Sequence, residues 1–322
     1  MVQIREEMVE KKRLAIVIPV YNDWQSLSFL LTEISNLLTP SYHQIKVLIV
    51  NDASTDEIFI PSPLNIQIEI LHLISNLGHQ KAIAIGIAHL AHQEDNDFVV
   101  VMDGDGEDDP ADIQLFREAS EQSPNSIVFA RRSKRSDGAL FGLFYVVYKM
   151  IFKIFTGHMI TFGNFCLIPG NRISRLAHVS EIWNHFSCGI IRSKLPFKTI
   201  RINRRKRSMG KPKMNLISLV IHGISSISVY IDVASVRLLI FFAGLILLSV
   251  SGIFGVIFIR LYTDLAIPGW ASTIGIGLIL VVLQLFFISL ILSFIILSHR
   301  SQMQFIPALH YKDYILKIDT ND

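Results

Sequence analysis

Two long uncharged stretches near the C-terminal end limit the fold of this chain more than any other feature. Residues 238–259 are 22 consecutive residues without a charge, and residues 270–297 are 28 more. As helices they would reach about 33 and 42 Å, against a hydrocarbon core of about 30 Å. Buried helices of a soluble core would need more surrounding protein than 322 residues supply. We therefore expect two transmembrane spans, joined by the short link 261–269 into a hairpin.

Basic residues flank this hairpin unequally. Four lie on the side of the two hairpin ends and one lies by the short link: Arg237, Arg300, Lys312 and Lys317 against Arg260. The positive-inside rule then places the large N-terminal region and both termini in the cytoplasm. The first apolar run, 14–20, is too short for a signal peptide, and two cysteines fit a reducing compartment. We expect an integral protein of the inner (cytoplasmic) membrane with two spans.

The region before the hairpin alternates between apolar runs and stretches of helical periodicity. The runs predict strands and the periodic stretches predict helices: strands at 14–20, 45–50, 66–73, 98–102 and 126–130, and helices at 26–38, 80–92 and 109–122. Strands separated by helices indicate an α/β fold with a mostly parallel sheet and helices on both faces. In such sheets ligands bind beyond the carboxyl ends of the strands.

Composition shifts divide the chain into five segments. These are an N-terminal tail (1–13), the α/β domain (14–200), a basic loop with an interfacial helix (201–235), the transmembrane hairpin (236–298) and a cytoplasmic tail (299–322). Residues 141–155 and 215–230 are apolar but too short to span a bilayer. We interpret both as amphipathic helices in the membrane interface, with ordinary core helices as the alternative.

Carboxylates gather after the fourth predicted strand. Five of the seven residues from Asp103 to Asp109 are acidic. Charge of one sign is costly to concentrate unless a cation neutralises it, and a hard divalent ion that also holds phosphate fits carboxylate oxygens. The alternative is a solvated loop that caps the next helix. We favour a binding site, because a second acidic loop, 51–56, comes after another predicted strand.

Three motifs carry a resemblance to a known family. The segments IPVYN (18–22), VNDASTD (50–56) and DGDGEDDP (103–110) resemble, in order and spacing, the signatures of family 2 glycosyltransferases. The resemblance covers residues 14 to 135 and implies the GT-A fold, which binds nucleotide sugars. The two predicted spans narrow it to the branch that glycosylates polyprenyl phosphates.

The resemblance also implies roles for individual residues. It assigns nucleotide-sugar binding to Pro19, Tyr21, Asn22, Asp52 and Asp103. It assigns Mg²⁺ or Mn²⁺ to Asp105, Glu107 and Asp103, with Glu107 standing where the family commonly has glutamine. It assigns catalysis to Asp103, Asp105 and Arg131, the last of which would face phosphate.

A basic segment precedes the hairpin. Residues 201–213 hold seven basic residues and no acid. Such a run can bind nucleic acid, but before a span each basic residue is worth about 1 kcal/mol toward anionic lipid, so we predict a membrane-facing patch and no nucleic-acid partner. The resemblance assigns acceptor phosphate to Arg131, Arg135, Arg207 and Lys213. Pro212 stands where the family has a serine.

One departure from the family concerns residues 163–167. Asn164 and Cys166 stand where many relatives have an aspartate and an arginine on either side of a phenylalanine. Both charges are missing together, which bears on the sugar or the acceptor more than on the type of reaction.

These observations predict a membrane-anchored inverting glycosyltransferase. It would move a sugar from a nucleotide diphosphate sugar to polyprenyl phosphate at the cytoplasmic face, in contact with the lipid bilayer, and a homo-oligomer is compatible with this. Transfer to a hydroxyl of a lipid-linked oligosaccharide is an alternative that needs a base such as Asp103 or Asp108. A non-catalytic membrane scaffold is another. A processive synthase is disfavoured, because no Gln-x-x-Arg-Trp motif occurs.

Overall fold

The chain forms two compact units in a computed structural model that describes residues 12–93, 96–132, 139–159, 162–203, 205, 216–264 and 269–321. The first unit comprises Met1–Gly142, Ile160–Val229 and Phe305–Asp322. The second comprises Leu143–Met159 and Tyr230–Gln304. The predicted boundaries at 200 and 299 therefore do not coincide with the structural units, since the C-terminal segment belongs to the first one.

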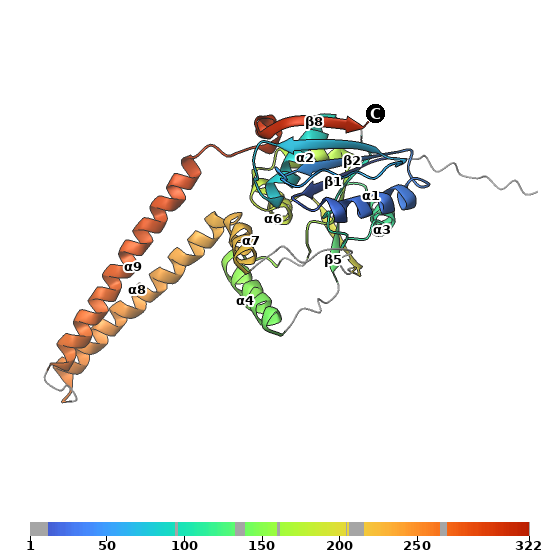
Figure 1. Cartoon of the computed structure of the whole chain (residues 1–322). Helices are drawn as coiled ribbons and strands as arrows, with labels where there is room; N and C mark the ends of the chain where they lie inside the picture. Colours follow the sequence, from blue (N-terminus) through green and yellow to red (C-terminus); the bar gives the residue numbers. More distant parts are fainter. Residues whose placement is uncertain are drawn as a thin grey trace, which may run out of the picture. The chain divides into compact units, whose positions relative to one another are not determined.

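An eight-stranded sheet organises the described part of the first unit (Figure 1). Its order is β7-β5-β6-β4-β1-β2-β3-β8, with these bounds: β1 Arg13–Val20, β2 Gln44–Asn51, β3 Gln67–Leu73, β4 Phe98–Val101, β5 Ile127–Arg132, β6 Cys166–Pro169, β7 Phe197–Ile202 and β8 Ile315–Asn321. β1, β2, β3 and β4 are parallel, and β5 pairs with β7 in parallel. β6 and β8 are antiparallel to their neighbours. The predicted mostly parallel α/β sheet is confirmed.

Helices cover both faces of this sheet because its central strands are apolar on both sides. On one face pack α1 (Trp24–Leu38) and α3 (Asp112–Glu121), and Leu30 and Ile34 of α1 are fully buried against β1 residues such as Ile16. On the other pack α2 (His79–Gln93), α5 (Gly170–Ala177), the short 3₁₀ helix η1 (Ser180–Trp183) and α6 (Phe186–Ser193). Alternate residues of β1 enter the two cores, as a two-sided strand requires.

The end of the chain differs from the sequence-based expectation. The segment predicted as a tail, 299–322, instead contains α10 (Pro307–His310), the 3₁₀ helix η2 (Tyr311–Tyr314) and β8. β8 pairs antiparallel with β3 along the sheet edge, and Ala308 and Tyr311 are buried in the core next to α2. β8 itself is mostly exposed, so its sequence carries little of the apolar pattern that marks an inner strand.

Two long helices dominate the second unit. α8 (Ile231–Tyr262) and α9 (Trp270–Ser301) have 32 residues each, mean hydropathies of 2.5 and 3.0 over their most apolar windows, and pack along each other (Figure 1). Only 6% and 0% of those windows is buried, whereas the core helix of a soluble protein would be mostly buried. Both helices could therefore span a membrane.

Two shorter apolar helices occupy the positions predicted for interfacial segments. They are α4 (Ala139–Thr156) and α7 (Leu216–Ser228). α4 exposes Val146, Met150 and Ile154, while Phe152 is buried and contacts the Tyr230 ring. Arg237 of α8 donates to the carbonyl oxygens of Lys153 and Ile154 and so caps the end of α4. The placement of these helices in a membrane interface stays a prediction.

Candidate functional site

The carboxyl ends of the parallel strands meet at one edge of the sheet, and the predicted site residues come directly after them. β6 runs antiparallel between β4 and β5, so its first residue lies at the same edge as their last residues. This brings the loops after β1, β2 and β4 together with Asn164, which precedes β6. Arg131, exposed at the end of β5, lies two strand spacings from β4, or about 10 Å.

Asn22 joins the loops that come after β1 and β2. Its side-chain oxygen accepts from the backbone N–H groups of Thr55 (2.7 Å) and Asp56 (3.2 Å), and its amide donates to the Thr55 hydroxyl. Asn22 and Ala53 both adopt the left-handed backbone region, with φ of 51° and 57°. A non-glycine residue in this region costs free energy and is concentrated at functional sites. Tyr21 is left 46% exposed beside this junction.

The acidic loop after β4 packs tightly on β1. A Cβ atom on Gly104 would lie 3.2 Å from Ile18 Cγ2, so a larger residue there would require Ile18 or the loop to shift by a few tenths of an ångström. The backbone N–H of Glu107 donates to Asp105 Oδ1 at 3.1 Å, and that of Asp103 donates to Asp108 Oδ2 at 3.3 Å. Two of the carboxylates therefore shape the loop from within.

Pro19 occupies a strand position that can dispense with an N–H donor. It is buried in β1 and in register with Val50 of β2. On its other side, the pairing of β1 with β4 ends at Val17. The missing donor therefore breaks no ladder hydrogen bond to β4.

Asp52 holds the loop that leads from β3 into α2. It is 3% exposed, and its two oxygens accept from the backbone N–H groups of Leu77 (2.7 Å) and Gly78 (2.9 Å). Burial raises the pKa of Asp52, and these two hydrogen bonds oppose the rise. These two hydrogen bonds fix the backbone of residues 77 and 78 next to His79. The direct contact of Asp52 with the nucleotide stays a prediction.

His79 is a site residue that was not predicted from the sequence. It begins α2, and its Nε2 lies 3.1 Å from Asp103 Oδ1. Partial burial would lower the pKa of His79, but the Asp103 carboxylate, helped by Asp105 and Asp52, raises it above its ordinary value. The side chain keeps 43% of its surface exposed and so remains accessible to a substrate. The loop between β3 and α2 ends at His79, so the same attention to strand ends that identified the other loops would have found it.

Asn164 lies within a network of neutral groups beside His79. Its Nδ2 is 3.1 Å from His79 Nε2, and its Oδ1 accepts from Ser187 Oγ at 3.2 Å and from Gln80 Nε2 at 3.5 Å. The Gln80 side chain is oriented by the Phe186 backbone N–H, which donates to its oxygen at 2.6 Å. An amide at this position forms hydrogen bonds but cannot act as a general base at neutral pH.

The carboxylates of the acidic loop determine how a divalent metal could be held. The described residues contain no group of three His, Cys, Asp or Glu side chains arranged to hold an ion. The assignment of a metal to Asp103, Asp105 and Glu107 stays a prediction. Mg²⁺ needs fewer protein ligands, since it is commonly bound through one or two carboxylates plus phosphate oxygens and water. The loop fits such a site.

Three predicted phosphate contacts lie outside the described residues: Arg135, Arg207 and Lys213.

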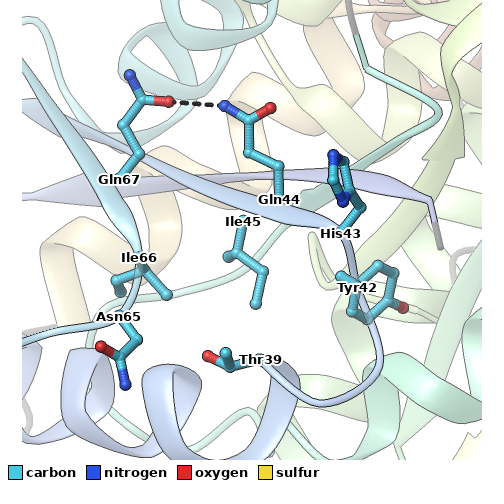
Figure 2. A pocket seen from close by; sticks show the side chains of 8 residues that line it. All are labelled: Thr39, Tyr42, His43, Gln44, Ile45, Asn65, Ile66 and Gln67. Atoms are coloured by element: carbon cyan, nitrogen blue, oxygen red, sulfur yellow. Dashed lines mark hydrogen bonds between the residues drawn. The ribbon is translucent and has the colours of Figure 1, made fainter.

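A hollow lined by Tyr42, Gln44 and Gln67 among others lies at the opposite edge of the sheet, at the amino ends of β2 and β3 (Figure 2). Gln44 there donates to Gln67 at 3.1 Å. That hollow is separate from the candidate site.

Comparison with known proteins identifies the family to which this chain is similar. The family model described as "Glycosyl transferase family 2" matches residues 15–183, just over half of the chain. Bacillus subtilis YkoT, an uncharacterized glycosyltransferase, is 29% identical over 81% of this chain and 80% of its own length.

Two further relatives match about 39–40% of this chain and 39% of their own length. The dodecaprenyl-phosphate galacturonate synthase of Rhizobium johnstonii is 25% identical over its matched part. The undecaprenyl-phosphate 4-deoxy-4-formamido-L-arabinose transferase of Photorhabdus laumondii is 31% identical.

Among solved structures, a glucosyl-3-phosphoglycerate synthase from Mycobacterium tuberculosis, in complex with Mn²⁺, UDP-glucose and phosphoglyceric acid, aligns with a TM-score of 0.49. It is 11% identical and covers 69% of this chain and 80% of its own. A mannosyl-3-phosphoglycerate synthase from Rubrobacter xylanophilus aligns with a TM-score of 0.47, at 13% identity over 68% and 72% of the two chains.

Proposed function

Because this chain belongs to glycosyl transferase family 2, we propose that it transfers a sugar from a nucleotide diphosphate sugar to a polyprenyl phosphate. Two relatives are named for dodecaprenyl- and undecaprenyl-phosphate products, which supports the acceptor class. The observation that carries the proposal is the neutral network around Asn164, which meets the acidic loop through His79. It places hydrogen-bonding side chains beside the acidic loop, and the partners that the structure gives Asn164 are His79, Gln80 and Ser187, none of which is a carboxylate.

A phosphate acceptor does not need a base. The second pKa of a phosphate monoester is about 6, so the attacking oxygen is already ionised at pH 7. A hydroxyl acceptor would need a proton removed, and Asp108, one of the two bases considered for that reaction, is only 1% exposed. The other, Asp103, is paired with His79. The burial of Asp108 and the names of the two relatives therefore favour phosphate over hydroxyl as the acceptor in this proposal.

The charged residues divide between donor and acceptor in this proposal. Asp105 and Glu107 would hold Mg²⁺ or Mn²⁺, which when bound neutralises the developing charge of the leaving diphosphate. Tyr21 and Asn22 would contact the nucleotide from the neighbouring loop. Arg131 would approach a phosphate from the end of β5, and such a preorganised cation stabilises the transition state.

The membrane arrangement is argued from α8, α9 and β8. If both long helices span, an even number of crossings returns the chain to its starting side. β8 comes after both helices in the chain and pairs with β3, which precedes them. Strands of one sheet cannot lie on opposite sides of a bilayer, so we place the catalytic unit and both helix ends on one side, the cytoplasmic one by the charge bias.

The test is a transfer assay on the full-length protein in proteoliposomes. Purified protein is supplied with undecaprenyl phosphate, Mn²⁺ or Mg²⁺ and a panel of radiolabelled nucleotide sugars. One donor should give a lipid-linked product that mild acid cleaves, because a sugar phosphodiester is acid-labile. Asp105→Asn should lower kcat by about 100-fold or more, since loss of one preorganised electrostatic contact costs roughly 3 kcal/mol.

Glu118→Gln, an exposed carboxylate on α3, is the matched control and should retain wild-type activity. In a parallel reaction supplied with a lipid-linked oligosaccharide, label that stays on the oligosaccharide after mild acid has released it from the lipid would instead establish the hydroxyl acceptor. Failure of every donor to give a product, together with no nucleotide binding by calorimetry, would favour the scaffold.

A further inference from the structure

Arg205 connects three separate parts of the first unit. Its NH1 lies 3.0 and 3.2 Å from the two carboxylate oxygens of Glu33 on α1. Its Nε lies 2.6 Å from Asp109 Oδ2, in the acidic loop. Its backbone N–H donates to the carbonyl oxygen of Glu107 at 3.1 Å. One residue from the segment after β7 is thus bound to the acidic loop at two points and to a helix at a third.

These contacts differ from an ordinary surface ion pair in geometry and burial. The side chains are partly shielded, with 38% of Arg205, 23% of Glu33 and 20% of Asp109 exposed. Charge-assisted hydrogen bonds of this length are about twice as strong as neutral ones. The other oxygen of Asp109 accepts from the backbone N–H of Ala111 at 2.8 Å, so Asp109 is held from both sides.

The field of Arg205 also reaches the start of α3. Burial and the neighbouring Asp109 raise the pKa of Asp112 to about 6, and Arg205 opposes that rise. The guanidinium is therefore a local counter-charge for carboxylates that would otherwise repel one another.

A basic residue of the segment 201–213 is in this way turned toward the protein. Most of that segment is expected, from its sequence, to form a patch facing lipid. Arg205 instead has its guanidinium between two carboxylates of the first unit, which neutralise its charge.

We propose that Arg205, anchored by Glu33, is a positioning residue that holds the acidic loop in the conformation that binds the metal and the donor diphosphate. This rests on the proposed function only for the identity of the ligand that the loop binds. Without the Arg205 guanidinium, the loop carries five acidic residues in seven positions and loses the cation that pairs with Asp109, so it samples other conformations. Arg205 acts through the loop and does not itself touch the reacting atoms.

The first experiment is independent of activity. Hydrogen–deuterium exchange is measured on the full-length protein in detergent, for wild type, Arg205→Lys, Glu33→Gln and the control Glu118→Gln. Lysine cannot bridge two carboxylates as the guanidinium fork does. Amides of 103–110 should exchange at least about 5-fold faster in the first two variants, while those of β4 should not change. Equal exchange over 103–110 in all four proteins would overturn the proposal.

The second experiment separates positioning from mere stabilisation. The Mn²⁺ concentration that gives half-maximal transfer should rise about 10-fold in Arg205→Lys, with kcat at saturating Mn²⁺ within about 2-fold of wild type. If Glu33 acts only through Arg205, Glu33→Gln should add nothing in an Arg205→Ala background.

Faster loop exchange with an unchanged Mn²⁺ requirement would reduce Arg205 to a structural role and overturn the proposal. If wild type transfers to a hydroxyl instead of a phosphate, the proposed function fails. The exchange and Mn²⁺ readouts would still decide the role of Arg205.

Discussion

Single buried polar residues of the sheet join its strands and helices through hydrogen bonds and ion pairs. Glu69 of β3 is the clearest case, since it is a carboxylate that is only 4% exposed. Its Oε1 lies 2.6 Å from His89 Nε2 of α2, and its other oxygen forms an ion pair with Lys46 of β2. Burial would raise the pKa of Glu69, but these two partners lower it from 4.5 to about 2. Three elements are therefore joined through one carboxylate.

We expect Glu69→Gln to destabilise the fold by about 3 kcal/mol at pH 7, because it leaves Lys46 without its counter-charge in a shielded place. The folded-state pKa lies below the unfolded one, so the carboxylate stabilises fully above about pH 4.5 and progressively less as the pH falls toward 2. Thermal midpoints of the two proteins in detergent should therefore converge on acidification. Glu121→Gln, which removes an exposed partner of Arg117, should cost at most about 1 kcal/mol and serves as control. A constant difference between wild type and Glu69→Gln from pH 7 to 3 would contradict this account.

At the scale of elements, the buried segments are the ones that the sequence predicts well. The predicted strand at 14–20 is β1, and the predicted helix at 26–38 is α1 with two more residues, because their apolar spacing reports two packed faces. β6, β7 and β8 were not predicted. β6 has only four residues, while β7 and β8 are largely exposed and are held mainly by backbone hydrogen bonds to a neighbour that the sequence does not specify.

In the candidate site as well, some residues could be predicted from the sequence next to them, whereas others are brought together only by the fold. Asp103 and Asp105 could be predicted because they directly follow an apolar strand. His79 and Asn164 are 85 residues apart and meet only through the order of the strands. Only the contact between His79 and Asn164 in the folded protein places them in one candidate site, and no local sequence pattern indicates that contact.

Removing β8 should promote self-association of the protein more than it lowers the free energy of unfolding. Six residues of β8 pair with β3, yet most β8 side chains are exposed, so the gain comes from backbone hydrogen bonds and from the contact of Asp319 Oδ2 with His72 Nε2 (2.9 Å), offset by the entropy of ordering the strand. A chain ending at Tyr314 should lose roughly 1–2 kcal/mol but expose the apolar edge of β3, and such edges pair with other chains. Light scattering after size exclusion should show aggregates in this variant. Leu316→Ala, at a position 67% exposed, should remain monodisperse, and the idea fails if the truncated protein does as well.

For the whole molecule, the proposed arrangement in a membrane can be tested with thiol-reactive labels, because we expect the two native cysteines not to react with them. Cys166 and Cys188 are fully buried, and burial raises the pKa of both thiols, so neither forms the reactive thiolate readily. A single introduced cysteine can then report which side of the bilayer it occupies. The sequence predicts two crossings from length and charge alone, and the pairing of β8 with β3 supplies an independent argument.

Asp264→Cys, between α8 and α9, should react in intact cells with a maleimide that cannot cross membranes. Thr320→Cys, on exposed β8, should react only after the cells are permeabilised, because the proposed arrangement puts it on the cytoplasmic side. Mass shifts on gels give the labelled fraction in each case. Equal labelling of both positions in intact cells would rule out a spanning hairpin.

The position of β8 also fixes an order of events during synthesis. The ribosome makes β3 early and β8 only after both long apolar helices, so the outer edge of β3 has no β8 to pair with until those helices have been made. In the proposed membrane arrangement, the sheet is therefore completed only after its anchor. A chain interrupted before β8 presents an open sheet edge, and such edges can pair with other chains.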